Sequence, residues 1–394
     1  MRVVILVRRH WLPLWQPFFE RLAARHGVEL TVITPAAHFR DGVSREVVVA
    51  GAATYDHVSI PCYLRIHEHE APQVYTRSFG RVIAAARPDL IHVIGEAGYV
   101  CAWQAIRAAR ALRVPAKVSL YAAQNILQPW PLPFAQIEQY CLRHADMLFP
   151  LGEEHETVVR QKGYRGPAVQ MPLGVDPELF RPVAPGIASR LAGDDAPVVG
   201  YVGKLIDAKG VDLLLCAAAL CRPRPRLLLI GSGPAEPKLR ALADRLGLAP
   251  QVTWASQVPH RDLPAWYAAM DLFVLPSRQV PRSTLYWWYP VAWKEQFGRV
   301  LTEAMACERA VIGSDSGEIP AVVGDAGLIF PENDVEELAA QMGNLLHDPG
   351  QRQTLALRGR QRVLAHYTWD AVTERYVRVW AELLQHPAVC EMAQ

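Results

Sequence analysis

The chain alternates short apolar runs with longer amphipathic stretches from its first residues onward. "RVVILV" at 2–7 is a β-branched run typical of a buried parallel strand. Pro17 opens a helical pattern that ends at Gly27, and "VELTVIT" at 28–34 follows as a second strand. Four further runs are predicted as strands, at 89–95, 116–121, 145–151 and 168–174. This alternation predicts a doubly wound α/β domain.

The same alternation restarts after a stretch rich in proline and glycine, at 172–197, which we interpret as an interdomain linker. The second series of predicted strands lies at 198–203, 226–231, 251–255, 271–276, 310–314 and 327–330. Two helical segments close the chain, the last at 369–385. We therefore expect two copies of one architecture, divided near residue 180. Two such domains that face each other across a cleft are well suited to bind a nucleotide-linked ligand.

The composition agrees with two folded domains and limits the classes of molecule that the protein is expected to bind. A chain of 394 residues is too long for a single core, and 51% hydrophobic residues exclude global disorder. A formal net charge of +2 gives no electrostatic case for nucleic acid. Seven cysteines without Cys-x-x-Cys spacing favour reduced thiols. Because neither a long apolar run nor a signal peptide is apparent, we expect a cytoplasmic protein, at most peripheral to the inner face of a membrane.

Lysine is rare in this chain, and two of the six lysines fall in one loop. Lys204 and Lys209 lie between a predicted strand that ends at Gly203 and a helix that begins near Gly210. Ligands of open α/β sheets bind at this edge, and a diphosphate would gain from two ammonium groups and the helix dipole. The alternative is a pair of solvated loop lysines.

A second strand–glycine–helix unit reads "LLLIGSGPAEPKLRALADRLG". It lacks the full Gly-x-Gly-x-x-Gly pattern because Glu236 occupies the place of the third glycine. We expect Gly231 and Gly233 to let the backbone turn tightly and approach a flat or anionic ligand.

The segment "KEQFGRVLTEAMA" holds Glu295 and Glu303, eight positions apart. On one continuous helix they would lie roughly 80° apart. The preceding segment "SRQVPRSTLYWWYP" at 277–290 is predicted as a loop, so a helix that starts near Gly298 instead leaves Glu295 in the loop before it and Glu303 within the helix. The free N–H groups of that helix start suit sugar hydroxyls or phosphate, with Glu295 as a fixed acceptor. Alternatively, Glu295 complements the helix dipole and Glu303 is solvated.

The succession "PLGVDPELFRP", "GYVGKLIDAKGVDLLL", "LLLIGSGP", "LPS" and "EQFGRVLTEAMACERAVIGSDSGEIP" resembles the retaining, GT-B-fold glycosyltransferases of family 4. The resemblance implies two Rossmann-like domains: residues 1–180, onto which 369–394 pack back, and residues 181–368, which bind the donor. It also implies transfer of a hexose from a UDP- or GDP-sugar to a hydroxyl of a sugar, lipid-linked or small-molecule acceptor.

The resemblance further implies a role for each matching residue. Glu295 would lie by the reacting carbon of the donor sugar, and Glu303 would bind the nucleotide ribose. Lys204 and Lys209 would hold the diphosphate and stabilise it as it leaves. Other residues expected around the donor are Gly203, Gly231, Ser277, Gln296, Phe297 and Gly298.

The chain departs from the family pattern at several positions. Lys204 stands where many members have arginine, so the bidentate guanidinium fork is lost. The usual glycine-rich loop after the first strand is replaced by "RRHWLPLW", which makes Arg8, Arg9 or His10 candidates for phosphate or acceptor contact. Gln124 and Asn125 replace a common histidine on the acceptor side. Without an evident proton-transferring side chain, a front-face mechanism is expected, in which the diphosphate takes the acceptor's proton.

No Asp-x-Asp pair or His/Cys cluster is present, so we expect a metal-independent reaction without a cofactor. The aromatic stripe at 8–27 is either core or a surface that rests on a membrane. The apolar insert "TLYWWYP" at 284–290 lines the acceptor side or packs on the neighbouring domain. Two other functions stay open: a nucleotide-sugar epimerase of the same fold, and a catalytically silent nucleotide-sugar-binding protein.

Overall fold

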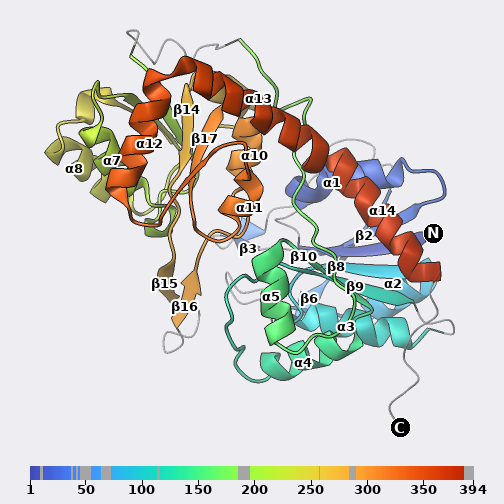
Figure 1. The fold of residues 1–394 in the computed structure, drawn as a ribbon. Helices are drawn as coiled ribbons and strands as arrows, with labels where there is room; N and C mark the ends of the chain where they lie inside the picture. The colour runs from blue at the N-terminus through green and yellow to red at the C-terminus, as the bar shows by residue number, and fades with distance from the viewer. Residues whose placement is uncertain are drawn as a thin grey trace. The chain divides into compact units, whose positions relative to one another are not determined.

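The computed structural model describes residues 1–8, 12–36, 39–40, 43–44, 55–63, 72–112, 116–184, 196–256, 258–283 and 290–385. The contacts divide the chain into two compact units. Unit 1 comprises Met1–Pro172 and Trp369–Gln394, and unit 2 comprises Leu173–Thr368. Each unit is built on its own six-stranded sheet (Figure 1).

The sheet of unit 1 is parallel throughout and follows the order β10-β9-β8-β1-β2-β5. Its strands are β1 (Arg2–Val7), β2 (Glu29–Pro35), β5 (Asp56–Ile60), β8 (Leu90–Ile94), β9 (Lys117–Ala122) and β10 (Met147–Pro150). The helices are α1 (Leu12–Ala23), α2 (Ser78–Ala86), α3 (Val100–Arg110), α4 (Phe134–His144), α5 (Glu153–Gln161) and α14 (Trp369–Gln385). Two short pairs, β3 (Phe39–Arg40) with β4 (Val43–Ser44) and β6 (Cys62–Tyr63) with β7 (Val74–Tyr75), and the edge strand β5 were not predicted.

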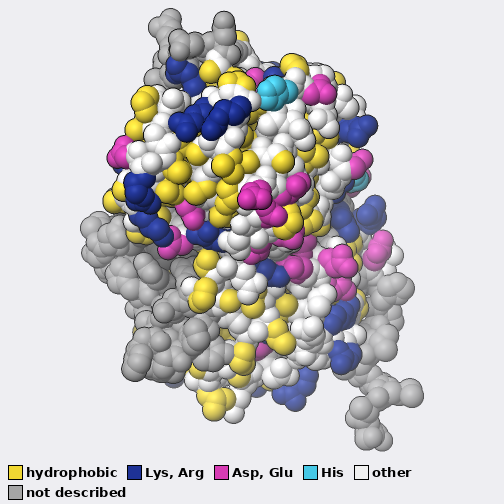
Figure 2. Space-filling view, turned by 60° about the vertical axis from the view of Figure 1, so that its left-hand side comes forward, with side chains coloured by type: hydrophobic (Ala, Val, Ile, Leu, Met, Phe, Trp, Pro, Cys, Tyr) yellow, Lys and Arg dark blue, Asp and Glu magenta, His cyan; other side chains and the backbone are white. Residues whose placement is uncertain are grey.

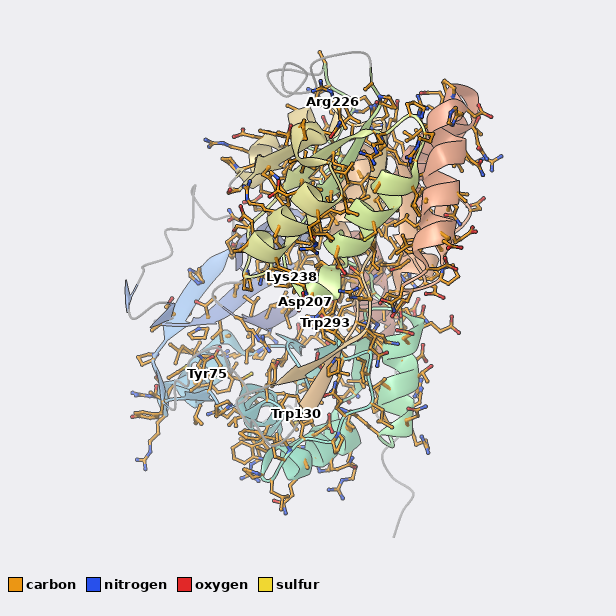
Figure 3. The ribbon with its side chains drawn as sticks, turned by 90° about the vertical axis from the view of Figure 1, so that its left-hand side faces the viewer. Tyr75, Trp130, Asp207, Arg226, Lys238 and Trp293 are labelled. Atoms are coloured by element: carbon orange, nitrogen blue, oxygen red, sulfur yellow. The ribbon has the colours of Figure 1, made fainter. Side chains whose placement is uncertain are left out.

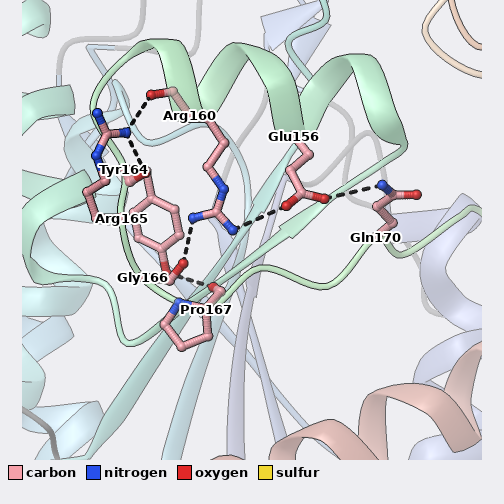
Figure 4. A network of polar contacts seen from close by, with 7 residues as sticks. All are labelled: Glu156, Arg160, Tyr164, Arg165, Gly166, Pro167 and Gln170. Atoms are coloured by element: carbon pink, nitrogen blue, oxygen red, sulfur yellow. Dashed lines mark hydrogen bonds and ion pairs between the residues drawn. The ribbon is translucent and has the colours of Figure 1, made fainter.

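The predicted strand at 168–174 is wrong. This segment runs beside β10: a single bridge joins Leu148 to Ala168, and the Val169 and Met171 N–H groups donate to the Leu148 and Pro150 carbonyls, but no strand ladder forms. Side chains fix the turn just before it (Figure 4): the Arg160 guanidinium donates to the Gly166 carbonyl at 2.7 Å, and the Tyr164 hydroxyl donates to the Pro167 carbonyl at 2.8 Å. The backbone pairing with β10 reaches only to Met171, and Pro150 has no N–H with which to bond back to the Val169 carbonyl, so the predicted strand does not form.

Helix α1 begins at Leu12, so the prediction that Pro17 opens it is also wrong. A proline this close to the start removes only one intrahelical bond, and the burial of Trp15, Phe18 and Phe19 compensates for the loss. These rings meet α14, which lies along α1 (Figure 1): Phe18 and Tyr376 have ring centroids 5.0 Å apart, and Trp15 and Trp369 5.5 Å. The described part of the aromatic stripe is thus core, and the closing helix packs on the N-terminal unit as expected.

The sheet of unit 2 is also parallel, in the order β13-β12-β11-β14-β17-β18. Its strands are β11 (Val198–Val202), β12 (Arg226–Ile230), β13 (Val252–Ala255), β14 (Leu272–Leu275), β17 (Ala310–Ser314) and β18 (Leu328–Phe330). Its helices are α7 (Val211–Leu220), α8 (Glu236–Arg245), α9 (Leu263–Tyr267), α10 (Arg299–Ala306), α11 (Ile319–Val323), α12 (Val335–His347) and α13 (Pro349–His366). Three 3₁₀ turns join them: η2 (Asp207–Lys209), η3 (Ala249–Gln251) and η4 (His260–Asp262).

The order of this sheet places a topological switch point between β11 and β14. The chain runs from β11 outward to β13 on one side, then returns to β14 and continues to β18 on the other. Loops that leave the carboxyl ends of two such central strands diverge, and ligands of open α/β sheets bind between them. We therefore expect the functional site among the residues that follow β11 and β14.

A short antiparallel ribbon follows β14, formed by β15 (Val280–Ser283) and β16 (Pro290–Trp293). The sequence suggested an irregular loop from 277 to 290, so this part of the prediction is wrong. Pro281 and Pro290 obscured the strand pattern, although proline is tolerated in a two-stranded edge ribbon. The insert at 284–289 between the strands, and the Asp194–Asp195 pair, lie outside the described residues.

The helices and the surface charges of the described residues bear on membrane crossing and on the kind of ligand. Among the described residues, no helix combines the length and the apolar character that crossing a bilayer requires. Figure 2 shows basic and acidic side chains together on the face that it draws, in keeping with a formal net charge of +2.

Candidate functional site

The loop after β11 is held rigidly against the end of β14. Gly210 adopts φ +62°, and a Cβ there would lie 1.9 Å from the Pro276 carbonyl oxygen. Beside it, the Arg278 N–H donates to the Ala208 carbonyl at 2.9 Å. These backbone contacts require a glycine at 210 and fix η2, which carries Lys209, at the switch point.

Lys209, Glu295 and Ser277 form a buried polar cluster at this position. The Lys209 ammonium donates to a carboxylate oxygen of Glu295, and the Ser277 hydroxyl donates to the same carboxylate at 2.7 Å. Glu295 is 6% exposed and Ser277 is fully buried. The expected catalytic carboxylate and one of the expected phosphate-binding lysines therefore lie in direct contact, although 86 positions separate them in the sequence.

Gly298 adopts φ +74° and stands at the N-cap of α10, which starts at Arg299. The predicted helix start between the two glutamates is thus correct: Glu295 lies in the loop before α10, and Glu303 within the helix. Phe297 packs inward, edge-on to Tyr367 with ring centroids 5.8 Å apart. Gln296 is exposed. The buried Phe297 side chain therefore anchors the turn before α10, and the backbone of this turn stays available to a ligand.

Glu303 is buried among partners rather than solvated. Its carboxylate accepts from the Tyr267 hydroxyl at 3.1 Å and lies 2.9 Å from His260 Nε2 and 3.1 Å from Arg299 Nε. Burial alone raises the pKa of Glu303, but Arg299, His260 and Tyr267 outweigh it, so that the pKa lies below its ordinary value. Glu303 is therefore a fixed negative charge, which excludes the solvated alternative.

The remaining candidate donor-site residues of unit 2 are Lys204 and the glycines of two neighbouring loops. Lys204 is exposed, and among the described residues its ammonium has no ion-pair partner. Gly203 and Gly231 meet each other: a Cβ on Gly231 would lie 1.9 Å from the Gly203 carbonyl oxygen. A Cβ on Gly233 would lie 2.2 Å from the Leu205 carbonyl oxygen. Contact between two neighbouring loops, not only a ligand, thus explains why Gly231 and Gly233 are glycines.

In unit 1, Gln124 lies next to a buried charge pair at the carboxyl end of β9. The Lys162 ammonium donates to Glu138 Oε1 at 2.6 Å and to Gln124 Oε1. Because lysine only donates, the Gln124 carbonyl must face it and the amide N–H groups must point away. The amide N–H groups of Gln124 are therefore not used in the contact with Lys162. The neighbouring Asn125 is buried, at 7% exposed.

Glu96 joins the ends of β8 and β9 near this pair, since it accepts from the Ala123 N–H at 2.9 Å. Burial raises the pKa of Glu96 despite nearby Lys162. Arg8 places its guanidinium 4.3 Å from the Tyr99 ring centroid. Arg9 and His10 lie outside the described residues, so the structure does not address these two candidates.

Sequence reasoning missed several side chains of these clusters. Trp293 has the Lys209 ammonium 4.8 Å from its ring centroid, and His260 and Arg299 flank Glu303. The tryptophan two positions before Glu295 was a visible signal. His260 was not, because nothing in the local pattern links it to a carboxylate 43 positions away. Within the described ranges, no three His, Cys, Asp or Glu side chains gather as metal ligands would.

Solved structures share this fold over the whole chain. Sucrose-phosphate synthase from Thermosynechococcus elongatus superimposes with a TM-score of 0.74 over 97% of this chain and 99% of its own, at 23% sequence identity. Two parallel six-stranded α/β units, with the closing helix packed on the first, define the GT-B fold of glycosyltransferases.

Sequence comparison then gives the family. The family model of the glycosyl transferases group 1 matches residues 187–362, and that of the glycosyl transferase 4-like domain matches residues 18–174. With both models matched, the chain belongs to the glycosyl transferase group 1 family, which is glycosyltransferase family 4. The family predicted from the motifs is thereby confirmed.

Two curated relatives are similar over part of their length. The D-inositol 3-phosphate glycosyltransferase of Thermobispora bispora is 33% identical over 228 residues, which are 54% of this chain and 50% of that protein. The GDP-mannose-dependent alpha-(1-6)-phosphatidylinositol monomannoside mannosyltransferase of Mycolicibacterium smegmatis is 31% identical over 207 residues, 50% of this chain and 52% of that protein. The chain thus aligns with about half the length of these relatives.

Proposed function

We propose that this protein is a retaining glycosyltransferase that moves a hexose from a nucleoside diphosphate sugar to a hydroxyl acceptor. The observation that carries the proposal is the buried contact of Glu295 with Lys209 and Ser277, at the switch point of a parallel sheet. A cation there suits a diphosphate, and a carboxylate beside it suits sugar hydroxyls.

The reaction needs one bond to break and one to form on the same face of the sugar. The bond from C1 to the diphosphate oxygen breaks, the acceptor oxygen bonds to C1, and the acceptor proton passes to the departing diphosphate. Negative charge grows on that diphosphate, and the ammonium groups of Lys209 and Lys204 stabilise it without reorganisation. The exposed Lys204 is free to turn toward the ligand, whereas Lys209 is already fixed.

Glu295 and Glu303 serve different parts of one donor molecule. Glu295 orients the sugar from the loop before α10. Glu303, buried and charged within α10, accepts from the ribose either directly or in exchange for His260, whose side chain is 51% exposed. His260 and Arg299 contact Oε1 and only Tyr267 contacts Oε2, so Oε2 keeps one acceptor position for a ribose hydroxyl, and displacement of His260 would open another on Oε1.

The acceptor is proposed to contact unit 1, where Gln124 presents amide donors. Inositol phosphate and phosphatidylinositol mannoside acceptors deserve testing first, since the names of the two relatives mention such molecules. We also propose that the reaction needs no metal ion and no cofactor, because lysine and the helix start supply the positive charge.

The test is a panel of UDP- and GDP-hexoses, each incubated with inositol 3-phosphate, with phosphatidylinositol mannoside in vesicles, or without acceptor. We expect one donor to release nucleoside diphosphate only when an acceptor is present, with a product that keeps the donor's anomeric configuration. Glu295→Gln and Lys209→Met should each lower turnover by about 10² or more, a typical loss when preorganised electrostatic groups are removed. Glu336→Gln, on the exposed face of α12, is the matched control.

Three results would replace this proposal. An altered sugar still attached to its nucleotide would indicate an epimerase. Tight donor binding without any turnover would indicate a silent nucleotide-sugar-binding protein. Wild-type turnover in Glu295→Gln would remove the assigned role of this carboxylate.

A further inference from the structure

Trp293 lies at the base of the β15–β16 ribbon, where its backbone pairs with Val280. Figure 3 labels Trp293 and, on η2, Asp207. Its ring faces Lys209 with the ammonium 4.8 Å from the centroid, inside the range of a cation–π contact. Trp293 is partly buried, so one ring face is engaged while the residue still borders the site.

The Lys209 ammonium thus has two partners of different kinds. Glu295 is a charged partner, and a donor sugar would compete for its carboxylate. Trp293 is a neutral partner, and its ring face attracts the cation without using the ammonium hydrogens for a conventional hydrogen bond. The tryptophan therefore keeps the lysine in place without cancelling the positive charge that a diphosphate requires.

The surrounding backbone leaves the lysine side chain as the part that can move. Gly210 against Pro276, and Ala208 against Arg278, already fix η2. A lysine stem is long and rich in rotamers, and its charge is useful only if the ammonium stays at one point. A second carboxylate at position 293 would hold the ammonium as well, but it would repel phosphate.

We propose that Trp293 is a positioning residue for the proposed transfer reaction: its ring holds the Lys209 ammonium toward the diphosphate when Glu295 turns to the sugar. This inference rests on the proposed function and adds to it a residue outside the motif set. The ribbon that carries Trp293 thereby becomes a structural part of the donor site.

The test measures binding of UDP and GDP by titration calorimetry, and of uridine and guanosine by ligand-observed NMR. Trp293→Leu should weaken binding of the preferred nucleoside diphosphate about tenfold, the size expected of a desolvated cation–π contact. Binding of the nucleoside, which has no phosphate, should change by less than roughly twofold. Trp293→Phe keeps an aromatic face and should recover most of the loss.

A double-mutant cycle decides whether the tryptophan acts through the lysine. In a Lys209→Met background, Trp293→Leu should have little further effect on nucleoside diphosphate binding. The matched control is Trp254→Leu, which removes a comparable contact with Arg240, 4.6 Å from the Trp254 centroid, on β13 and α8. This control should bind the diphosphate like the wild type, and thermal melts should show each variant folded.

Each outcome distinguishes this inference from the proposed function. If the wild type binds a nucleoside diphosphate and Trp293→Leu binds it equally well, the inference is wrong and the function stands. The inference is also rejected if Trp293→Leu weakens binding of the nucleoside as much as binding of the nucleoside diphosphate. It is rejected as well if Trp293→Leu weakens diphosphate binding to the same extent in the Lys209→Met background, because the tryptophan would then not act through the lysine. If the wild type binds no nucleotide or nucleotide sugar, the proposed function fails and the inference fails with it.

Discussion

Acidification should destabilise unit 1 through one histidine. His92 lies in the middle of β8, fully buried, with its Nδ1 2.9 Å from the Ser119 hydroxyl. The rings of Phe149, Tyr376 and Trp380 surround it at centroid distances of 5.3 to 5.5 Å. This enclosure gives a charged imidazolium no solvent, and burial lowers the pKa of His92 from 6.5 to about 3.

The size of the effect follows from proton linkage. The unfolded chain binds a proton at this residue below pH 6.5, whereas the folded chain resists it down to about pH 3. Stability is therefore unaffected above pH 6.5 and falls as the pH drops through this window, by about 1.4 kcal/mol for each pH unit. At pH 5 the loss from His92 is about 2 kcal/mol, or roughly a 30-fold larger open fraction.

Hydrogen exchange of the β8 peptides at pH 7.5 and pH 5, corrected for intrinsic rates, measures this loss. In His92→Gln the residue cannot titrate, so the pH-dependent loss of protection should be about 2 kcal/mol smaller than in the wild type. His26→Gln removes an exposed histidine and should keep the wild-type pH dependence. Equal losses in the wild type and in His92→Gln would refute the argument that burial keeps this imidazole neutral.

Three further predictions concern the packing of unit 2 and the metal independence of the reaction. Gly231→Ala should destabilise unit 2 by more than about 1 kcal/mol in thermal unfolding, because the added Cβ would strike the Gly203 carbonyl. Gly343→Ala, which has open space around it in α12, should stabilise unit 2 by about 0.5–1 kcal/mol. Equal shifts of the melting temperature in the two variants would contradict this prediction. Glu303→Gln should cost about 1–3 kcal/mol, since Arg299 loses its buried counter-charge, and an unchanged melting temperature would show that the pair contributes nothing. Turnover should stay within about twofold in excess chelator, and a loss that magnesium restores would establish a metal requirement.

The strands of both sheets could largely be predicted from the sequence, because buried parallel strands are short apolar runs between glycine and proline. "VVGYVG" and "DLFVLP" each contain the strand that the structure shows. The start of α10 could also be predicted, since Gly298 is a residue that adopts a positive φ at low cost. The prediction of a strand at 168–174 failed because Val169 and Met171 bond to the backbone of β10, but Pro150 has no N–H with which to complete the pairing.

The interior of the candidate site was only partly predictable. Motif spacing indicated Lys209 and Glu295, but their direct contact depends on the approach of Gly210 to Pro276, which no local pattern encodes. Arg299 lies four positions before Glu303 on α10, but His260 and Tyr267 come from η4 and α9, so their convergence on Glu303 is a property of the tertiary fold. Trp293 was visible in the sequence, yet its meaning depends on the lysine that the fold brings to its ring.

The division of the chain has a consequence for the order in which the protein is made. In the sequence, unit 2 is inserted between the two segments that make up unit 1. The ribosome therefore completes all of residues 173–368 before Trp369, Tyr376 and Trp380 emerge. Until then, the inward faces of Trp15 and Phe18 have no partner from α14. The unit that begins first therefore finishes last, and the nascent chain must protect an unfinished aromatic core while a complete domain folds after it.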